Sequence, residues 1–125
     1  MRYANFNKYH ARKANCFYGH QHDSKKEAER CNDLHLMQAH GLISGLEIQK
    51  KYQLIPQQRE PDTTTATGKT VKGKVIEREV NYIADFVYVE NGATVVEDTK
   101  GMRLPEYVLK RKLMLFKYGI RIKEI

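Results

Sequence analysis

The sequence predicts an α/β fold in which one helix, three strands, a second helix and a final strand surround one mixed sheet. Three observations carry this prediction. Apolar residues recur at helical spacing near both ends of the chain, runs rich in β-branched and aromatic residues fill its middle, and a segment rich in proline and threonine interrupts those runs. With 125 residues, of which 41% are hydrophobic, residues 1–125 are expected to form a single domain with a modest core.

The first helix is predicted to run from Ser24 to about Gly41. A serine hydroxyl can cap a helix at its start, and glycine adopts the left-handed conformation that often ends one. Between them, small and apolar residues recur at helical spacing, as at Ala28, Cys31 and Leu34.

Residues 1–22 are predicted to form a basic N-terminal arm before this helix. Residues 1–26 contain six lysines or arginines against one acidic residue, Asp23. Tyrosines and phenylalanines are interleaved with these charges, and aromatic rings beside cations suit unpaired bases as well as a small core. Both uses of the aromatic residues stay open.

Three strands are predicted next, at Leu46–Ile55, Val80–Glu90 and Thr94–Thr99. The first alternates between apolar and polar residues, and the other two are rich in β-branched and aromatic residues. Asn91-Gly92 joins the second strand to the third, and this dipeptide is the strongest short hairpin signal. Residues 56–75 contain hardly an apolar group and therefore predict a flexible basic loop at the tip of a long hairpin. Such a loop could wrap a substrate, and a solvated insertion without a role is the alternative.

The second helix is predicted over Pro105–Tyr118, because proline suits a first helical turn and the glycine that follows suits a helix end. The predicted inward residues are Leu109, Leu113 and Phe116, and the predicted outward residues are Lys110 and Arg111. In residues 120–125, isoleucines alternate with charged residues, which predicts a half-buried final strand.

The excess of positive charge predicts nucleic acid as the partner. Lysines and arginines number 22 against 15 acidic residues, a formal net charge of +7. Such a surface attracts a polyanion through its phosphates, so binding of DNA is expected to depend on structure more than on base sequence. The candidate nucleic-acid contacts are Lys8, Arg12, Lys13, Lys25, Lys69, Lys72 and Lys74.

Cys16 and Cys31 are the only cysteines, and no run of apolar residues resembles a signal segment or a membrane span. We therefore expect a cytoplasmic protein with free thiols and no membrane partner. Cys16, His20, His22 and Cys31 are suitable zinc ligands at short range, yet neither Cys-x-x-Cys nor His-x3-His spacing is present. That absence favours free thiols and solvated imidazoles over a zinc site.

Two aspartates in the predicted hairpin are the strongest candidates for chemistry. If Asn91-Gly92 is a two-residue turn, counting outward from it places Asp85 opposite Asp98. Directly opposed side chains have Cβ atoms about 4.5–5.5 Å apart, so the two carboxylates would repel each other. A divalent cation removes that repulsion, and Mg²⁺ prefers carboxylate oxygens together with water and phosphate oxygens.

The two-residue period of a strand assigns the neighbours of Asp98. Lys100 lies two residues further on and is expected on the same face, within reach of a metal-bound water or a phosphate. Glu97 is expected on the opposite face, as a surface carboxylate or a hydrogen-bond partner of the ligands. The alternative is an ion pair between Asp85 and Lys100, with Asp98 solvated. Strand interiors disfavour aspartate, so the metal-binding interpretation is favoured.

Asp85, followed after a hairpin by Asp98-Thr99-Lys100, resembles the signature of the PD-(D/E)xK nuclease superfamily, an acid and then acid-x-Lys on the next strand. The predicted order of helices and strands also resembles the core of that superfamily. Four segments further resemble a family of small phage and prophage proteins assigned to this nuclease class: residues 23–29, 46–54, 82–88 and 95–101. The resemblance spans about residue 8 to the end of the chain. It departs from the signature in one place, because Ala84 rather than proline precedes Asp85.

This resemblance implies a restriction-endonuclease-like core, α-β-β-β-α-β, with a central mixed sheet flanked by helices. It implies that Asp85 and Asp98 bind Mg²⁺ or Mn²⁺, often together with the carbonyl of Thr99. It also implies that Lys100 positions or deprotonates the attacking water. Glu27 matches an acidic residue that many members bring from the first helix.

Four residues have a second interpretation. Ser24-Lys25-Lys26-Glu27 is also a capping box, in which Glu27 bonds back to the start of the helix. Gln49 matches a glutamine that related nucleases direct at the site, and an exposed strand amide is the alternative. Tyr107 and Lys110 are candidate phosphate contacts, and a solvated helix face is the alternative for both.

The expected function is that of a Mg²⁺-dependent endonuclease that hydrolyses phosphodiester bonds of DNA, with branched DNA among its candidate substrates. The resemblance implies a phage or prophage protein that acts in the bacterial cytoplasm, and a homodimer, because related nucleases that resolve branched DNA are dimers. A non-catalytic nucleic-acid-binding accessory protein of phage replication, packaging or recombination is the main alternative. A small basic structural protein resembling a ribosomal component is a further one, but it leaves Asp85 and Asp98 unexplained.

Overall fold

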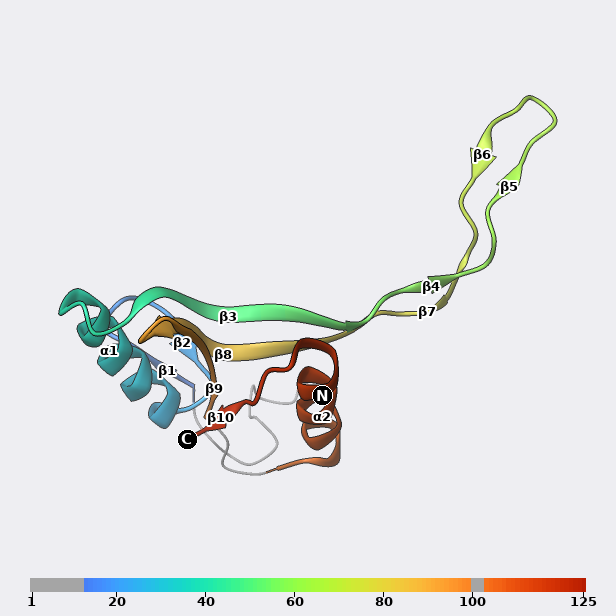
Figure 1. The fold of residues 1–125 in the computed structure, drawn as a ribbon. Coiled ribbons are helices and arrows are strands. Elements are labelled where there is room, and N and C mark those ends of the chain that lie inside the picture. The colour runs from blue at the N-terminus through green and yellow to red at the C-terminus, as the bar shows by residue number, and fades with distance from the viewer. Residues whose placement is uncertain (1–12, 100–102) are drawn as a thin grey trace, which may run out of the picture. The chain divides into compact units, whose positions relative to one another are not determined.

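The computed structural model describes residues 13–99 and 103–125 (Figure 1). These residues belong to two units. The first takes the chain up to Lys50 together with Ala84–Arg103 and Ile122–Ile125, and the second takes Lys51–Ile83 and Leu104–Arg121.

A four-stranded mixed sheet has the strand order β10 (Lys123–Glu124), β9 (Ala93–Asp98), β8 (Val80–Glu90) and β3 (Ser44–Ile55). β8 and β9 pair antiparallel, whereas β9 and β10 pair parallel. The predicted final strand over 120–125 is therefore real but short, and it lies beside β9.

The hairpin between β8 and β9 has the register that its turn sequence predicts. Asn91 and Gly92 have φ values of 51° and 77°, the left-handed conformations that a two-residue turn of this type requires. Five residue pairs follow, from Glu90–Ala93 to Phe86–Glu97. The register prediction is confirmed over these pairs.

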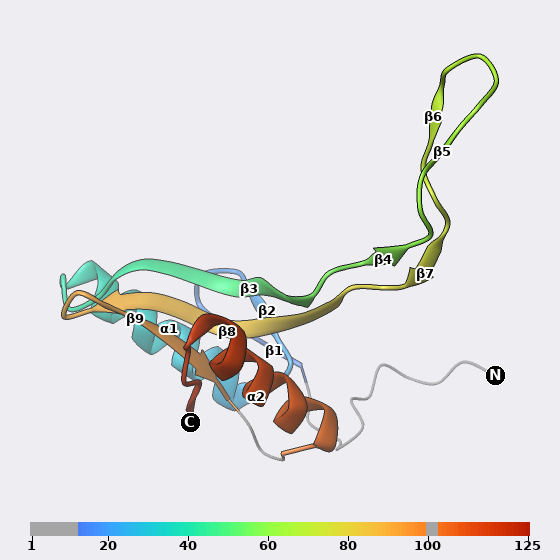
Figure 2. The same ribbon diagram turned by 45° about the vertical axis from the view of Figure 1, so that its right-hand side comes forward.

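Helix α1 (Lys25–Ala39) begins as the sequence predicts. The hydroxyl of Ser24 accepts a hydrogen bond from the Glu27 amide at 3.1 Å, which satisfies one of the free amides of the first turn. Figure 2 shows α1 lying along one face of the sheet strands of its own unit. Its buried residues, Ala28, Cys31 and Leu34, form the core of this unit together with Phe86, Tyr88, Cys16 and Ile43.

The residues just before α1 correct one prediction. Residues 14–22, expected to belong to a basic arm, form an antiparallel hairpin of β1 (Ala14–Asn15) and β2 (Gln21–His22) that packs against α1. Cys16 and His22 are buried there. Tertiary packing on the helix orders this segment, although its local composition alone suggested a solvated arm.

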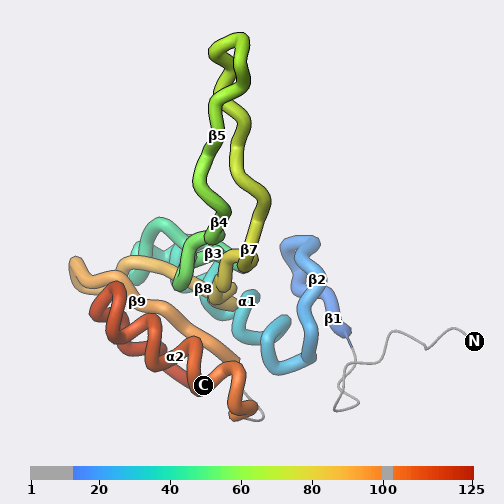
Figure 3. Tube along the Cα trace, turned by 90° about the vertical axis from the view of Figure 1, so that its right-hand side faces the viewer, coloured from blue at the N-terminus to red at the C-terminus, as the bar shows by residue number. Residues whose placement is uncertain are grey.

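In the second unit, residues 56–75 contain more regular structure than the predicted loop. β4 (Gln58–Arg59) pairs with β7 (Val75–Glu77), and β5 (Thr63–Thr64) pairs with β6 (Thr70–Val71), so the chain forms one long hairpin (Figure 3). All four strands are exposed, so backbone pairing holds them more than side-chain packing does.

Helix α2 (Pro105–Tyr118) has the predicted bounds, and Gly119 ends it in the left-handed conformation with φ 66°. Of the three residues predicted to face inward, only Leu113 is half-buried, and Lys110 and Arg111, predicted to face outward, are half-buried as well. Leu109 is 59% exposed and Phe116 is 89% exposed, whereas Tyr107 and Met114 are buried. These two are seven residues apart, so the buried stripe of α2 has helical spacing but includes different residues.

Two helices and one mixed sheet confirm the α/β class that the sequence predicts. Neither helix in the described parts of the chain is long and apolar enough to cross a membrane.

Candidate functional site

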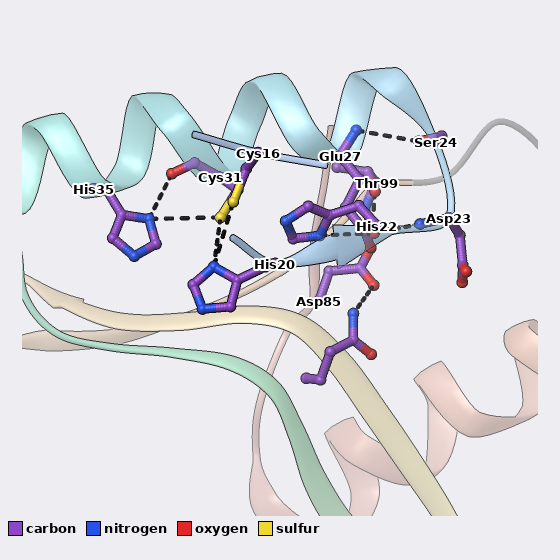
Figure 4. Close-up of polar contacts among 11 residues, drawn as sticks. Cys16, His20, His22, Asp23, Ser24, Glu27, Cys31, His35, Asp85 and Thr99 are labelled. Carbon is purple, nitrogen blue, oxygen red and sulfur yellow. Dashed lines mark hydrogen bonds and ion pairs between the residues drawn. The ribbon is translucent and has the colours of Figure 1, made fainter. Parts of the chain in front are cut away.

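Asp85 receives three hydrogen bonds from groups that the folded chain brings together. Its Oδ2 atom accepts from the Thr99 amide at 2.9 Å and from the Thr99 hydroxyl at 2.8 Å. Its Oδ1 atom accepts from the side-chain amide of Gln49 at 3.5 Å. β3 and the end of β9 therefore direct polar groups at one half-buried carboxylate of β8, as Figure 4 shows for Asp85 and Thr99.

Glu27 reaches the same carboxylate from the first turn of α1. It is only 3% exposed and hydrogen-bonds to Asp85. Its Oε2 atom accepts from the Asp23 amide at 3.0 Å and lies 3.1 Å from Nδ1 of His22. Glu27 thus contacts the backbone before the helix, in the manner of a capping box that is shifted by one residue, and also contacts Asp85.

Asp98 is the last residue of β9, where it is buried and pairs with Glu124 of β10. The regular pairing of β8 and β9 ends one step earlier, at Phe86 and Glu97. The side chain of Asp98 is nevertheless among the hydrogen-bond partners of Asp85. The structure therefore brings together the two aspartates that the turn register singles out.

We call Glu27, Asp85 and Asp98 the carboxylate cluster. Within it, the pKa of Glu27 and the pKa of Asp85 are shifted in opposite directions. Burial raises the pKa of Glu27, and the hydrogen bond and charge of Asp85 raise it further, to about 8. Burial also acts to raise the pKa of Asp85, but its hydrogen bonds with Glu27, Thr99 and Asp98 hold that pKa below its usual range. Near neutral pH, Glu27 therefore keeps its proton and donates it to the Asp85 carboxylate.

Gln49 has an unusual backbone for a residue inside a strand. Its φ is 56°, in the left-handed region that residues other than glycine rarely adopt. Such a conformation costs about 1–3 kcal/mol and persists where surrounding structure requires it. In this strand it occurs at the residue whose side chain contacts Asp85.

The other predicted site residues lie outside the described residues, in the second unit, or at exposed positions of the chain. Lys100, Lys8 and Arg12 lie outside the described residues. Tyr107 and Lys110 belong to the second unit, where Tyr107 is buried with its ring 6.5 Å from that of Tyr82 and Lys110 pairs with Glu106 at 3.1 Å. The remaining predicted nucleic-acid contacts are exposed: Lys13 and Lys25 in the first unit, and Lys69, Lys72 and Lys74 on the long hairpin.

The prediction that Glu97 is a surface carboxylate or a hydrogen-bond partner of the metal ligands is wrong. Glu97 is completely buried rather than on the surface, and its carboxylate accepts hydrogen bonds from Arg30 at 2.8 and 2.6 Å and from the Tyr88 hydroxyl. Burial acts to raise its pKa, but the bonds from Arg30 and Tyr88 hold the pKa below its usual range. Lys123 of β10 also approaches the carboxylate, at 3.9 Å.

Sequence reasoning missed Arg30 and the contact of His22 with Glu27, both of which support buried acids. Arg30 is 67 residues from Glu97 in the chain, so no local pattern connects them. His22 lies five residues before Glu27, and this short His-x4-Glu spacing across a helix start is the one signal that could have identified the pair.

Comparison with curated proteins found no match, and comparison with solved structures found none either. Residues 6–124 match one family model, whose description is "Protein of unknown function (DUF1064)". Because the match covers nearly the whole sequence, the chain belongs to the DUF1064 family.

Proposed function

We propose that this protein is a Mg²⁺-dependent nuclease of the PD-(D/E)xK type that hydrolyses phosphodiester bonds in DNA. One observation carries the proposal. Glu27, Asp85 and Asp98 come from a helix and two strands far apart in sequence, yet their carboxyl groups form one cluster.

The donor set of the carboxylate cluster suits a hard divalent cation. Asp85 and Asp98 would bind it through carboxylate oxygens, with the carbonyl of Thr99 as a further ligand, and oxygen donors of this kind are what Mg²⁺ and Mn²⁺ prefer. Glu27 and Asp85 would repel each other if both were ionised. A bound cation would offset that repulsion. A bound Mg²⁺ supplies charge stabilisation at the phosphate and a lower pKa for water.

The residues around the carboxylate cluster have distinct parts in this proposal. Thr99 orients the Asp85 carboxylate through two hydrogen bonds, and Gln49 contacts its other oxygen. Glu27, once deprotonated, can accept a proton from the attacking water. The sequence motif assigns Lys100 to positioning that water or to balancing the charge that develops on the phosphate.

Exposed lysines on both units support DNA as the substrate. The formal net charge is +7. Lys13 and Lys25 are exposed near the start of α1, and Lys69, Lys72 and Lys74 are exposed on the long hairpin. Lysines of this kind contact phosphates, which gives affinity without base preference.

A cleavage panel tests the proposal. The substrates are duplex, single-stranded, flap and four-way-junction DNA, with RNA of matching sequence, each with Mg²⁺, with Mn²⁺ and without a divalent cation. We expect cation-dependent cleavage of at least one DNA substrate by the wild type and its loss in Asp98→Asn and Asp85→Asn. Asp33→Asn is the matched control, because Asp33 is an exposed acid on α1.

Cleavage by Asp98→Asn at the wild-type rate would remove the assigned metal site. Binding of DNA without cleavage under every condition would instead favour the non-catalytic accessory protein. The homodimer stays a prediction, and sedimentation that shows only monomer at high concentration would contradict it.

A further inference from the structure

Four potential metal ligands converge where the β1–β2 hairpin packs on α1. Cys16, His20, His22 and Cys31 each offer one ligand atom, and these four atoms all lie within 4.8 Å of one another. Nδ1 of His20 is 3.4 Å from the sulfur of Cys16 and 3.7 Å from that of Cys31 (Figure 4). We propose that these four residues, the Cys2His2 cluster, form a structural zinc site.

Two of the separations between ligand atoms match those of tetrahedral zinc. Zn–S bonds of about 2.3 Å and Zn–N bonds of about 2.0–2.1 Å place neighbouring ligand atoms of a tetrahedron about 3.3–3.8 Å apart. The separations of His20 Nδ1 from the two sulfur atoms, 3.4 and 3.7 Å, fall within this range.

His22 supplies an independent sign of a missing ligand. The residue is 1% exposed, and its Nε2 atom makes no hydrogen bond of ordinary geometry within the described parts of the chain, although the Cys16 thiol lies beside the ring. Its other ring nitrogen, Nδ1, is held by Glu27 at 3.1 Å. Figure 4 shows the free nitrogen directed toward the two sulfur atoms. A histidine held by a carboxylate through one nitrogen and open at the other is the usual arrangement around a zinc ligand.

The donor atoms select zinc over the cation proposed for the carboxylate cluster. Two thiolates with two imidazoles form the S₂N₂ set that zinc prefers, whereas Mg²⁺ prefers oxygen. Nδ1 of neighbouring His35 also lies 3.5 Å from the Cys31 sulfur, but it lies closer, at 2.8 Å, to the Cys31 carbonyl oxygen, so we leave His35 outside the set. The cysteines are free rather than joined as a disulfide.

Zinc at the Cys2His2 cluster would explain why so small a hairpin is ordered. β1 and β2 are two residues each, so their ladder alone contributes little stability. Three ligands come from this hairpin region and the fourth from α1, so one ion would join them. This inference stands whether or not the proposed nuclease activity is found.

The test uses the full chain, expressed without a histidine tag and purified without chelator. Elemental analysis by mass spectrometry should find about one zinc ion per chain. After zinc is removed and Co²⁺ is added, the visible spectrum should show the intense bands of tetrahedral cobalt bound to thiolate. Removal of zinc should also lower the thermal midpoint, and added zinc should restore it.

Single substitutions distinguish the proposed zinc ligands from nearby residues that do not bind zinc. Cys31→Ser and His22→Gln should lose the zinc and the cobalt spectrum, whereas His40→Gln, at an exposed histidine at the end of α1, should keep both. Because Cys31 and His22 lie in the core, the half-buried His20 provides a milder variant, and His20→Gln should weaken Co²⁺ binding while the helical circular dichroism is kept. Wild-type protein that holds no zinc and gives no thiolate bands with Co²⁺ would overturn the proposal. Full zinc content in folded Cys31→Ser protein would overturn it as well.

Discussion

Glu27 of α1 and Asp85 of β8 meet carboxyl to carboxyl and are joined by a hydrogen bond. The pair has one proton to share, which Glu27 keeps near neutral pH because burial and the Asp85 charge raise its pKa to about 8. On its other side, Glu27 contacts His22, a ligand of the proposed zinc site. Glu27 therefore connects the Cys2His2 cluster to the carboxylate cluster.

Glu27→Gln should flatten the dependence of stability on pH in protein without added Mg²⁺. The pKa of a glutamate in an unfolded chain is about 4.3, whereas the pKa of Glu27 in the folded protein is about 8. Its contribution to the free energy of unfolding is thus complete below about pH 4.3 and is lost as the pH rises to about 8. Asp85 has the opposite sign, because its pKa is lowered, so its contribution is lost only in acid.

Urea unfolding across this range measures the difference. Between pH 5 and pH 8, the wild type should lose up to about 1.4 kcal/mol per pH unit relative to Glu27→Gln. Glu29→Gln is the control, because Glu29 is exposed on the same helix. Parallel pH profiles for wild type and Glu27→Gln would show that Glu27 does not hold the proton.

Gln49→Gly should raise stability and lower cleavage. Glycine adopts the φ of 56° without strain, so the free energy of unfolding should increase by up to about 1–3 kcal/mol. Loss of the amide beside Asp85 should reduce Mg²⁺-dependent cleavage about 10- to 100-fold. Chemical denaturation and single-turnover cleavage measure the two effects, and Glu47→Gly, at a residue of β3 without positive φ, should instead destabilise. A Gln49→Gly variant that is less stable than wild type would refute the assigned strain.

Glu97→Ala should destabilise the protein by about 3–5 kcal/mol, because it leaves the Arg30 guanidinium without the carboxylate that balances its charge. The exposed control Glu29→Ala should change stability by less than about 0.5 kcal/mol. The pKa of Glu97 is lowered in the folded state, so its contribution is present above the unfolded value and is lost as the pH falls through the folded one. Urea unfolding at neutral and acidic pH measures both effects. A small change in Glu97→Ala would mean that water replaces the carboxylate.

Replacement of Lys69, Lys72 and Lys74 by glutamine should weaken DNA binding and its dependence on salt. Each phosphate contact that is lost should reduce the slope of log affinity against log salt by about 0.9 for duplex DNA. Fluorescence anisotropy at several salt concentrations gives that slope. Lys112→Gln on α2 is an exposed control. An unchanged slope in the triple variant would show that the long hairpin does not contact the DNA backbone.

Local signals in the sequence determined the features that a few neighbouring residues control. Ser24 and Pro105 begin helices and Gly119 ends one, as predicted, because caps depend on the hydrogen bonds and φ angles of single residues. Asn91-Gly92 determined the register of its hairpin in the same way, and that register led to Asp85 and Asp98 as neighbours.

Only the tertiary structure decided which side chains these elements bury and bring together. It buried Tyr107 and Met114 of α2 in place of Leu109 and Phe116, because several stripes of that helix are apolar enough to pack. It also paired Glu97 with Arg30, and it gathered the Cys2His2 cluster from a hairpin and a helix. Contacts of this kind depend on how separate elements pack, and no local sequence pattern encodes that packing.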